Sequence, residues 1–167
     1  VSAACQVVDR AVKAPRVTDP WYIDFLLTTC KTERVGLVIP TIDTELLLLS
    51  QHRDAFASEG IHLIISDESL VRVCRDKRLT ADLFKSLDID SPKIYDHSTI
   101  EFPCFAKPYD GSCSIGAAAV RTPDMLSDAM LADEKMMFME MIDNTHQEYT
   151  VDAYYDRQGR LRCFVPR

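Results

Sequence analysis

The chain has 167 residues, of which 47% are apolar and 27% charged, a balance typical of a globular protein that can bury its own core. Its formal net charge is −7 and its basic residues are scattered, so we expect no extended nucleic acid as a partner. No stretch approaches the roughly 20 apolar residues of a membrane span, so no membrane partner is expected either. A single nucleotide stays compatible with this charge, because a few lysines and backbone N–H groups can hold its phosphates.

The cysteines and histidines do not predict a zinc site or a disulfide framework. The six cysteines are far apart in the sequence: Cys5, Cys30, Cys74, Cys104, Cys113 and Cys163. Because they form neither CxxC nor Cys/His pairs at ligand spacing, we expect reduced thiols in a cytoplasmic protein. The histidines lie beside no candidate nucleophile or second ligand, so structural roles are expected for all four: His52, His62, His97 and His146.

The first part of the chain alternates helix-like and strand-like segments, which predicts an α/β fold. Pro20 opens a predicted helix that runs to residue 33, and an apolar run at 35–40 predicts a strand buried on both faces of a parallel sheet. The loop 40–45 that follows is expected to face a ligand. Asp43 or Thr44 is the predicted cap of a helix that ends at Ser58, and residues 61–65 form a second apolar strand.

The pattern changes in the second part of the chain. A helical stretch at 67–87, broken near 76–80, is followed by a short extended segment at 93–95. Strands at 102–108 and 117–121 are expected to pair antiparallel, and a helix at 123–132, a strand at 135–141 and a hairpin of 148–155 with 161–165 should follow. We therefore predict two domains, at residues 1–70 and 71–167, with an antiparallel lobe at about 93–140.

The loop after the first antiparallel strand carries the strongest functional signal. Lys107 ends the strand, and the loop that follows contains Gly111, Ser112, Ser114 and Gly116. Small residues let backbone N–H groups approach phosphate oxygens, hydroxyls add donors, and the ammonium adds charge. The spacing fits neither a Walker A loop nor GxGxxG. An ordinary flexible hairpin with a surface lysine explains this segment alone about equally well.

Two further segments carry weaker signals. The basic cluster at 74–80 contains Lys77, although a solvated helix face is the commoner meaning of such a cluster. The apolar strand ending at Glu140 and the acid Glu148 beyond it could present a flat edge to a base and an acceptor to a ribose. A sheet core with two exposed carboxylates is the alternative.

The order of these segments resembles that of the ATP-grasp superfamily. It runs from Asp76-Lys77 through Pro92 and Lys107-Pro108 with its Gly/Ser loop to Glu140 and Glu148. Residues 38–46, VIPTIDTEL, are similar to the end of the pre-ATP-grasp domain of carbamoyl-phosphate-synthase large-subunit-like members. The resemblance implies a partial Rossmann-like pre-ATP-grasp domain, followed by the N-terminal part of an ATP-grasp fold with its antiparallel small lobe.

The same resemblance assigns roles to individual residues. It implies that Lys77 and Lys107 contact the phosphates of ATP and that the loop 110–116 covers them. The adenine would lie along Glu140, Met141 and Ile142, and Glu148 would hold the ribose. The segment 143–147 is about one residue longer than in several members of the family. Members of the family take their Mg²⁺ ligands from segments that would follow residue 167, so we assign neither a metal ligand nor a catalytic residue in this chain.

Three functions are compatible with this reading. The first is the ATP-binding portion of a carboxylate–amine or ammonia ligase that works through an acyl phosphate, with ATP and a small carboxylate as partners and a homo-oligomer left open. The second is a nucleotide-binding module without catalysis, which carboxylate-dependent ATP hydrolysis would distinguish from the first. The third is a receiver- or flavodoxin-like domain with Asp43 at a strand end, although the antiparallel segment after residue 102 fits that topology poorly.

Overall fold

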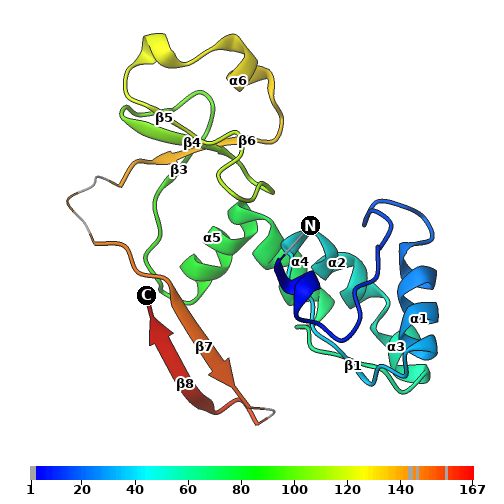
Figure 1. Cartoon of the computed structure of the whole chain (residues 1–167). Helices are drawn as coiled ribbons and strands as arrows, with labels where there is room; N and C mark the ends of the chain where they lie inside the picture. The colour runs from blue at the N-terminus through cyan, green and yellow to red at the C-terminus, as the bar shows by residue number, and fades with distance from the viewer. Residues whose placement is uncertain (1–2, 143–144, 146, 157) are drawn as a thin grey trace. The chain divides into compact units, whose positions relative to one another are not determined.

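The computed structural model describes residues 3–142, 145, 147–156 and 158–167 (Figure 1). The chain divides into two compact units, of which the first contains residues 1–91 and 108–116 and the second contains 92–107 and 117–167. The Gly/Ser loop thus belongs to the first unit, while most of the residues of the strands that flank it belong to the second. The domains predicted at 1–70 and 71–167 stay a prediction.

The first unit contains short parallel strands and helices around one apolar core. In chain order its elements are η1 (Ala3–Gln6), α1 (Tyr22–Thr32), β1 (Leu37–Val38), α2 (Asp43–Gln51), α3 (Arg53–Ser58), β2 (His62–Leu63), α4 (Glu68–Arg75) and α5 (Lys77–Ser86). Leu37 of β1 pairs with His62 of β2 in parallel register, which confirms the predicted parallel pairing. The buried core residues come from the helices and from the start of the second predicted strand: Tyr22, Ile23, Cys30, Leu49, Phe56 and Ile61.

The prediction that these strands are buried on both faces is wrong. Val38 and Leu63 pack against the core, but Leu37 is 49% exposed and Ile64 is 54% exposed. Alternate side chains of a strand point to opposite faces, and here the helical core covers one face of a two-stranded sheet. A continuous apolar run therefore did not mean two-sided burial in this chain.

The helix predicted to end at Ser58 is two helices. His52 separates α2 from α3, and its ring Nδ1 lies 2.8 Å from the carbonyl oxygen of Leu48. Neither Asp43 nor Thr44 caps α2, because the N-cap residue is Ile42, whose side chain makes no capping hydrogen bond. The loop 40–45 is instead tied by Glu45, whose Oε1 accepts a hydrogen bond from Thr41 N at 3.3 Å.

The second unit is built on an antiparallel sheet. Its elements are β3 (Ile94–Tyr95), β4 (Cys104–Pro108, whose last residue falls in the first unit), β5 (Ala118–Val120), η2 (Pro123–Met125), α6 (Asp128–Ala132), β6 (Met136–Glu140), β7 (Val151–Tyr155) and β8 (Leu161–Pro166). The strand order of the four-stranded sheet is β3-β6-β4-β5, and β4 pairs antiparallel with β5 as predicted. Its core residues are Tyr95, Cys104, Ala106, Val120 and Phe138.

Two predictions for this unit have different outcomes. The single helix predicted at 123–132 is wrong, because it is a 3-10 turn and a short helix separated at Leu126 and Ser127, with the Ser127 hydroxyl accepting from Met130 N. The predicted hairpin is confirmed. Its turn is organised by Asp156, whose carboxylate accepts from the N–H groups of Gln158 and Arg160, and these bonds hold its pKa below the usual range.

The strand topology tests the receiver- or flavodoxin-like alternative, and the helix lengths test for a membrane span. The described strands form three separate sheets, so the continuous doubly wound sheet of a receiver- or flavodoxin-like domain is not found among them. Within the described ranges, no helix has the length and apolar character needed to cross a membrane.

A buried phenol in the first unit predicts a loss of stability at high pH. The hydroxyl of Tyr22 donates to Glu45 Oε2 at 2.6 Å, and burial together with this carboxylate raises the pKa of Tyr22 well above its usual range. The unfolded phenol ionises near pH 10 while the folded one stays protonated, so the bond stabilises the fold below about pH 10 and this stability is lost as the pH rises. Urea denaturation of the parent and of Tyr22→Phe should show a stability difference that shrinks from pH 8 to pH 11. A constant difference over that range would contradict the prediction.

Candidate functional site

The candidate site begins at the turn between α4 and α5, where Asp76 and Arg78 form a fixed pair. Asp76 caps α5, because its Oδ1 accepts from Arg78 N at 2.9 Å. The same carboxylate binds the guanidinium through both oxygens, with Nε at 3.1 Å and Nη2 at 2.7 Å. This two-point contact with Arg78 holds the pKa of Asp76 below its usual range and orients the guanidinium plane. The predicted break near 76–80 is therefore confirmed, with its cause in the cap.

Lys77 joins this turn to the Gly/Ser loop. Its backbone N donates to Tyr109 O at 3.0 Å. Its ammonium donates to Gly111 O at 2.5 Å, and to Tyr109 O and Pro108 O at the longer distances of 3.3 and 3.4 Å. The structure thus brings Lys77 to the loop that the sequence predicted as its partner in phosphate binding, although here its bonds go to loop carbonyls.

The loop folds back tightly on its own first residue. A Cβ added at Gly111 would lie 3.2 Å from Pro108 Cβ, and one added at Gly116 would lie 3.2 Å from Pro108 Cγ. Cys113, Ser114 and Gly116 all have positive φ angles, of 55°, 56° and 74°. Two successive non-glycine residues in this region store backbone strain, which is a feature of ligand-binding segments.

The outer part of the loop presents hydrogen-bond donors to solvent. Ser114 and Gly116 are exposed, and Ile115 is 76% exposed. Ile115 N bonds to Ser112 O, whereas none of the backbone–backbone hydrogen bonds of the described residues is donated by the N–H groups of Ser112, Ser114 or Gly116. A short run of such N–H groups together with serine hydroxyls is suited to an anion.

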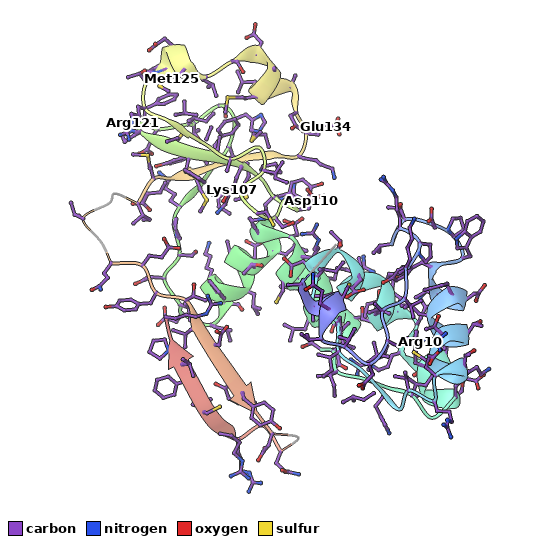
Figure 2. The ribbon with its side chains drawn as sticks, in the orientation of Figure 1. Arg10, Lys107, Asp110, Arg121, Met125 and Glu134 are labelled. Atoms are coloured by element: carbon purple, nitrogen blue, oxygen red, sulfur yellow. The ribbon has the colours of Figure 1, made fainter. Side chains whose placement is uncertain are left out.

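Lys107 is the last residue before Pro108 and lies on β4 (Figure 2). It is half-buried in the second unit, and its ammonium lies 5.7 Å from the centre of the Phe105 ring. One peptide bond joins it to the base of the loop, so the chain fixes its Cα beside the loop wherever its side chain points.

The residues predicted for the base and the ribose lie at the end of β6 and beyond it. Glu140 ties β6 to the segment before β3, because its N–H donates to Lys93 O at 2.8 Å and its Oε2 accepts from Lys93 N at 3.2 Å. Met141 is half-buried and Ile142 is 53% exposed. Glu148 is exposed and precedes β7. His146 lies outside the described residues.

The residues that the structure describes form no metal site by themselves. Within those residues, no three His, Cys, Asp or Glu side chains gather at distances that would hold a metal ion. The Mg²⁺ that the family resemblance implies therefore has no ligand set among them, and we derive no chemical step through it. The loop, by contrast, offers N–H groups and hydroxyls, and the ammonium of Lys77 contacts it, which are the kinds of group that bind a polyphosphate.

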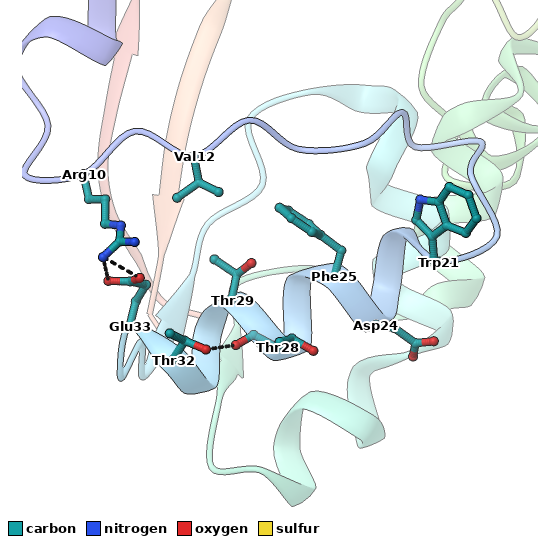
Figure 3. A pocket seen from close by; sticks show the side chains of 9 residues that line it. All are labelled: Arg10, Val12, Trp21, Asp24, Phe25, Thr28, Thr29, Thr32 and Glu33. Carbon is teal, nitrogen blue, oxygen red and sulfur yellow. Dashed lines mark hydrogen bonds and ion pairs between the residues drawn. The ribbon is translucent and has the colours of Figure 1, made fainter.

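A groove of about 500 Å³ lies elsewhere in the first unit, between the N-terminal segment and α1 (Figure 3). Val12 and Phe25 point into it, and the ion pair of Arg10 with Glu33 bounds one end. The three threonines in its wall, Thr28, Thr29 and Thr32, are on α1. None of the predicted site residues lines the groove. We assign no chemistry to it.

Comparison with known proteins supports the fold. Residues 1–64 match the PylC-like, N-terminal domain family. No curated protein matches the sequence.

Solved structures match most of the chain at low identity. L-amino acid ligase from Bacillus licheniformis is 18% identical, with a TM-score of 0.72 over 92% of this chain and 37% of that one. The biotin carboxylase domain of Hydrogenobacter thermophilus 2-oxoglutarate carboxylase, solved with MgADP, ADP and bicarbonate, is 11% identical, with a TM-score of 0.69 over 94% of this chain and 40% of that one. N5-carboxyaminoimidazole ribonucleotide synthetase from Thermus thermophilus is 16% identical, with a TM-score of 0.64 over 96% of this chain and 43% of that one.

These comparisons bear on the fold alone. The chain spans less than half of the length of each of these three solved structures. The predicted fold class is confirmed: the chain has a mixed α/β fold with antiparallel sheets, and it corresponds to part of the ATP-grasp fold of these solved structures.

Proposed function

We propose that this chain is the ATP-binding portion of an ATP-dependent carboxylate–amine or ammonia ligase that acts through an acyl-phosphate intermediate. The observation that carries the proposal is the contact of Lys77 with a strained, donor-rich loop that begins beside Lys107. The solved ligases and carboxylases with the same fold support it, since one of them was solved with MgADP and bicarbonate. The likeness of residues 38–46 to carbamoyl-phosphate synthases makes a member of that group our specific proposal.

The bonds of Lys77 are compatible with a second partner. The bond to Gly111 O is short, at 2.5 Å, whereas those to Tyr109 O and Pro108 O, at 3.3 and 3.4 Å, lie at the weak limit of hydrogen-bond geometry. The non-bridging oxygens of a phosphate share its negative charge, so each is a stronger acceptor than a neutral peptide carbonyl. We therefore propose that a phosphate replaces the two long bonds while the bond to Gly111 is kept.

The other predicted residues complete the binding site in this proposal. Lys107 contacts a second phosphate position, and the N–H groups and hydroxyls of Ser112 and Ser114 cover the polyphosphate. The backbone from Glu140 to Ile142 reads the adenine, and Glu148 accepts from the ribose hydroxyls. Lys77 and Lys107 would offset part of the charge of the transferring phosphoryl group, which is the main catalytic contribution in such reactions. Mg²⁺ bound with ATP would supply further positive charge there.

Titration of the chain with a non-hydrolysable ATP analogue tests the proposal. Lys77→Ala and Lys107→Ala should each weaken binding by about tenfold or more, because a hydrogen bond to a charged group contributes about 1.5 to 3 kcal/mol. Lys85→Ala is the matched control, since Lys85 lies exposed in the last turn of the same helix as Lys77.

The pattern of the three variants decides the outcome. Equal losses in all three would indicate a general effect of charge. Unchanged binding in both Lys77→Ala and Lys107→Ala would show that the site assignment is wrong. A turnover assay on the complete open reading frame separates the two functions: binding of ATP there without carboxylate-dependent hydrolysis would favour the nucleotide-binding module over the ligase.

A further inference from the structure

A contact beside the proposed phosphate site has no role in the function described so far. The guanidinium carbon of Arg78 lies 3.6 Å from the centre of the Tyr109 ring, which is a close cation–π stack. Both residues belong to the first unit but are 31 positions apart in the sequence. Neither was singled out by the sequence motifs.

A contact other than the ring also fixes the guanidinium of Arg78. Asp76 binds its Nε and Nη2, and that carboxylate is itself fixed as the cap of α5. The guanidinium plane is thus oriented by an element of secondary structure rather than by a free surface side chain. A lysine at this position could keep the charge but could provide neither the two-point contact nor the flat stack.

The tyrosine is linked in turn to the ammonium of Lys77. Tyr109 O accepts from both the backbone N and the Nζ of Lys77, at 3.0 and 3.3 Å. Pro108 and Gly111, on either side of it, supply the other two carbonyl oxygens around that ammonium. A movement of Tyr109 therefore moves the acceptor of the Lys77 backbone N–H and the nearby Gly111 carbonyl oxygen, and these are the two contacts that stay when a phosphate replaces the long bonds.

We propose that Arg78 and Tyr109 form a clasp that positions the base of the phosphate loop, and that this clasp sets the affinity for the polyphosphate part of the nucleotide. Asp76 orients the guanidinium of Arg78, and the position of Tyr109 affects phosphate binding through Lys77. These are positioning residues, because they act through Lys77 and the loop. The proposal rests on the proposed function, since it assumes that the loop binds phosphate.

The geometry also limits what the clasp affects. It holds residues 108–111, while residues 113–116 are exposed and make none of the contacts with Arg78 or Lys77 described above. The effect of losing the clasp should therefore appear in ligands that carry phosphates and not in adenosine alone.

A matched pair of variants tests the clasp. Tyr109→Phe keeps the aromatic face, whereas Tyr109→Leu removes it at similar apolar size. We expect Tyr109→Leu to weaken binding of the ATP analogue by about fivefold, in line with a partly exposed cation–π contact, and to leave adenosine binding unchanged. Tyr109→Phe should bind both ligands as the parent does. Equal ATP affinity in the Leu and Phe variants, or equal loss of ATP and adenosine in the Leu variant, would overturn the proposal.

A double-mutant cycle ties the effect to the pair. Arg78→Lys alone should lose about as much ATP affinity as Tyr109→Leu, and the double variant should lose no more than either single one. Additive losses would mean that the two side chains act separately and would also overturn the clasp.

Amide hydrogen exchange separates this proposal from the proposed function. Exchange in residues 109–111 should be faster in Tyr109→Leu than in Tyr109→Phe or the parent, with or without nucleotide. If the parent binds no ATP analogue, the proposed function fails, and the exchange comparison still decides whether the clasp exists. Identical exchange in the two variants would reject the clasp. If Tyr109→Leu loses protection throughout the chain, exchange in residues 109–111 is compared between Arg78→Lys and the parent instead, and identical exchange there would reject the clasp.

Discussion

Replacing Phe138 with alanine is expected to lower the free energy of unfolding of the second unit by about 3 to 5 kcal/mol, which is the usual cost of removing a fully buried aromatic side chain. Phe138 is 0% exposed and lies on β6, at the centre of the four-stranded sheet. It packs in the core with Cys104, and His97 meets its ring edge-on at a centroid distance of 5.2 Å. A unit with a core this small has few other buried side chains to compensate, so local unfolding is expected at moderate urea concentrations.

Urea denaturation followed by circular dichroism measures this loss, and amide exchange in β4 and β6 locates it. Phe138→Leu is the control, since it keeps most of the apolar volume and should cost less than about 1.5 kcal/mol. If Phe138→Ala cost no more than the leucine variant, the described core would not be the one that stabilises this sheet.

Replacing Gly116 with valine is expected to cost about 2 to 3 kcal/mol in stability and to abolish most of the affinity for the ATP analogue, by about a hundredfold, because two effects act at one position. The residue has a φ of +74°, which a β-branched side chain tolerates poorly. Its added Cβ would also meet Pro108 at 3.2 Å, so the loop would be pushed away from its own base.

Gly159 provides a control for the backbone effect alone. It has a φ of +71° in the β7–β8 turn, and nothing lies within 4 Å of an added Cβ. Gly159→Val should therefore show a similar backbone cost with unchanged nucleotide affinity. Nucleotide binding by Gly116→Val at the affinity of the parent would show that the loop does not need its described shape.

The elements of this fold were predictable where a local signal fixes them. Asp76 carries such a signal, because a capping residue breaks the helical stretch and starts α5. The antiparallel pair of β4 and β5 follows from the glycine-rich turn between two apolar runs. The break at His52 carried no such signal, and neither did the break at Ser127 inside an otherwise helical pattern. One-sided burial of Leu37 and Ile64 depends on which face the helices cover, and this is a tertiary property.

The candidate site was predictable in composition but not in contacts. The loop was recognisable from its small residues, and Lys77 from its place in the order of motifs. The carbonyl oxygens that surround the Lys77 ammonium are more than 30 positions away in the sequence, and nothing local indicates them. Arg78 and Tyr109 were missed for the same reason, since each is an ordinary surface residue in its own segment.

The reactivity of the native cysteines reports the solvent accessibility of the loop, so no engineered label is needed. Burial raises the pKa of the thiols of Cys30 and Cys104, so a thiol reagent at neutral pH should react with them slowly. The other four cysteines are exposed, and Cys113 is the one of these that lies in the loop itself. Its rate of modification, followed by mass spectrometry or with a chromogenic disulfide, reports how accessible this segment is to solvent. A ligand bound at the loop would lower the modification rate of Cys113 and leave the rates of the other exposed thiols unchanged.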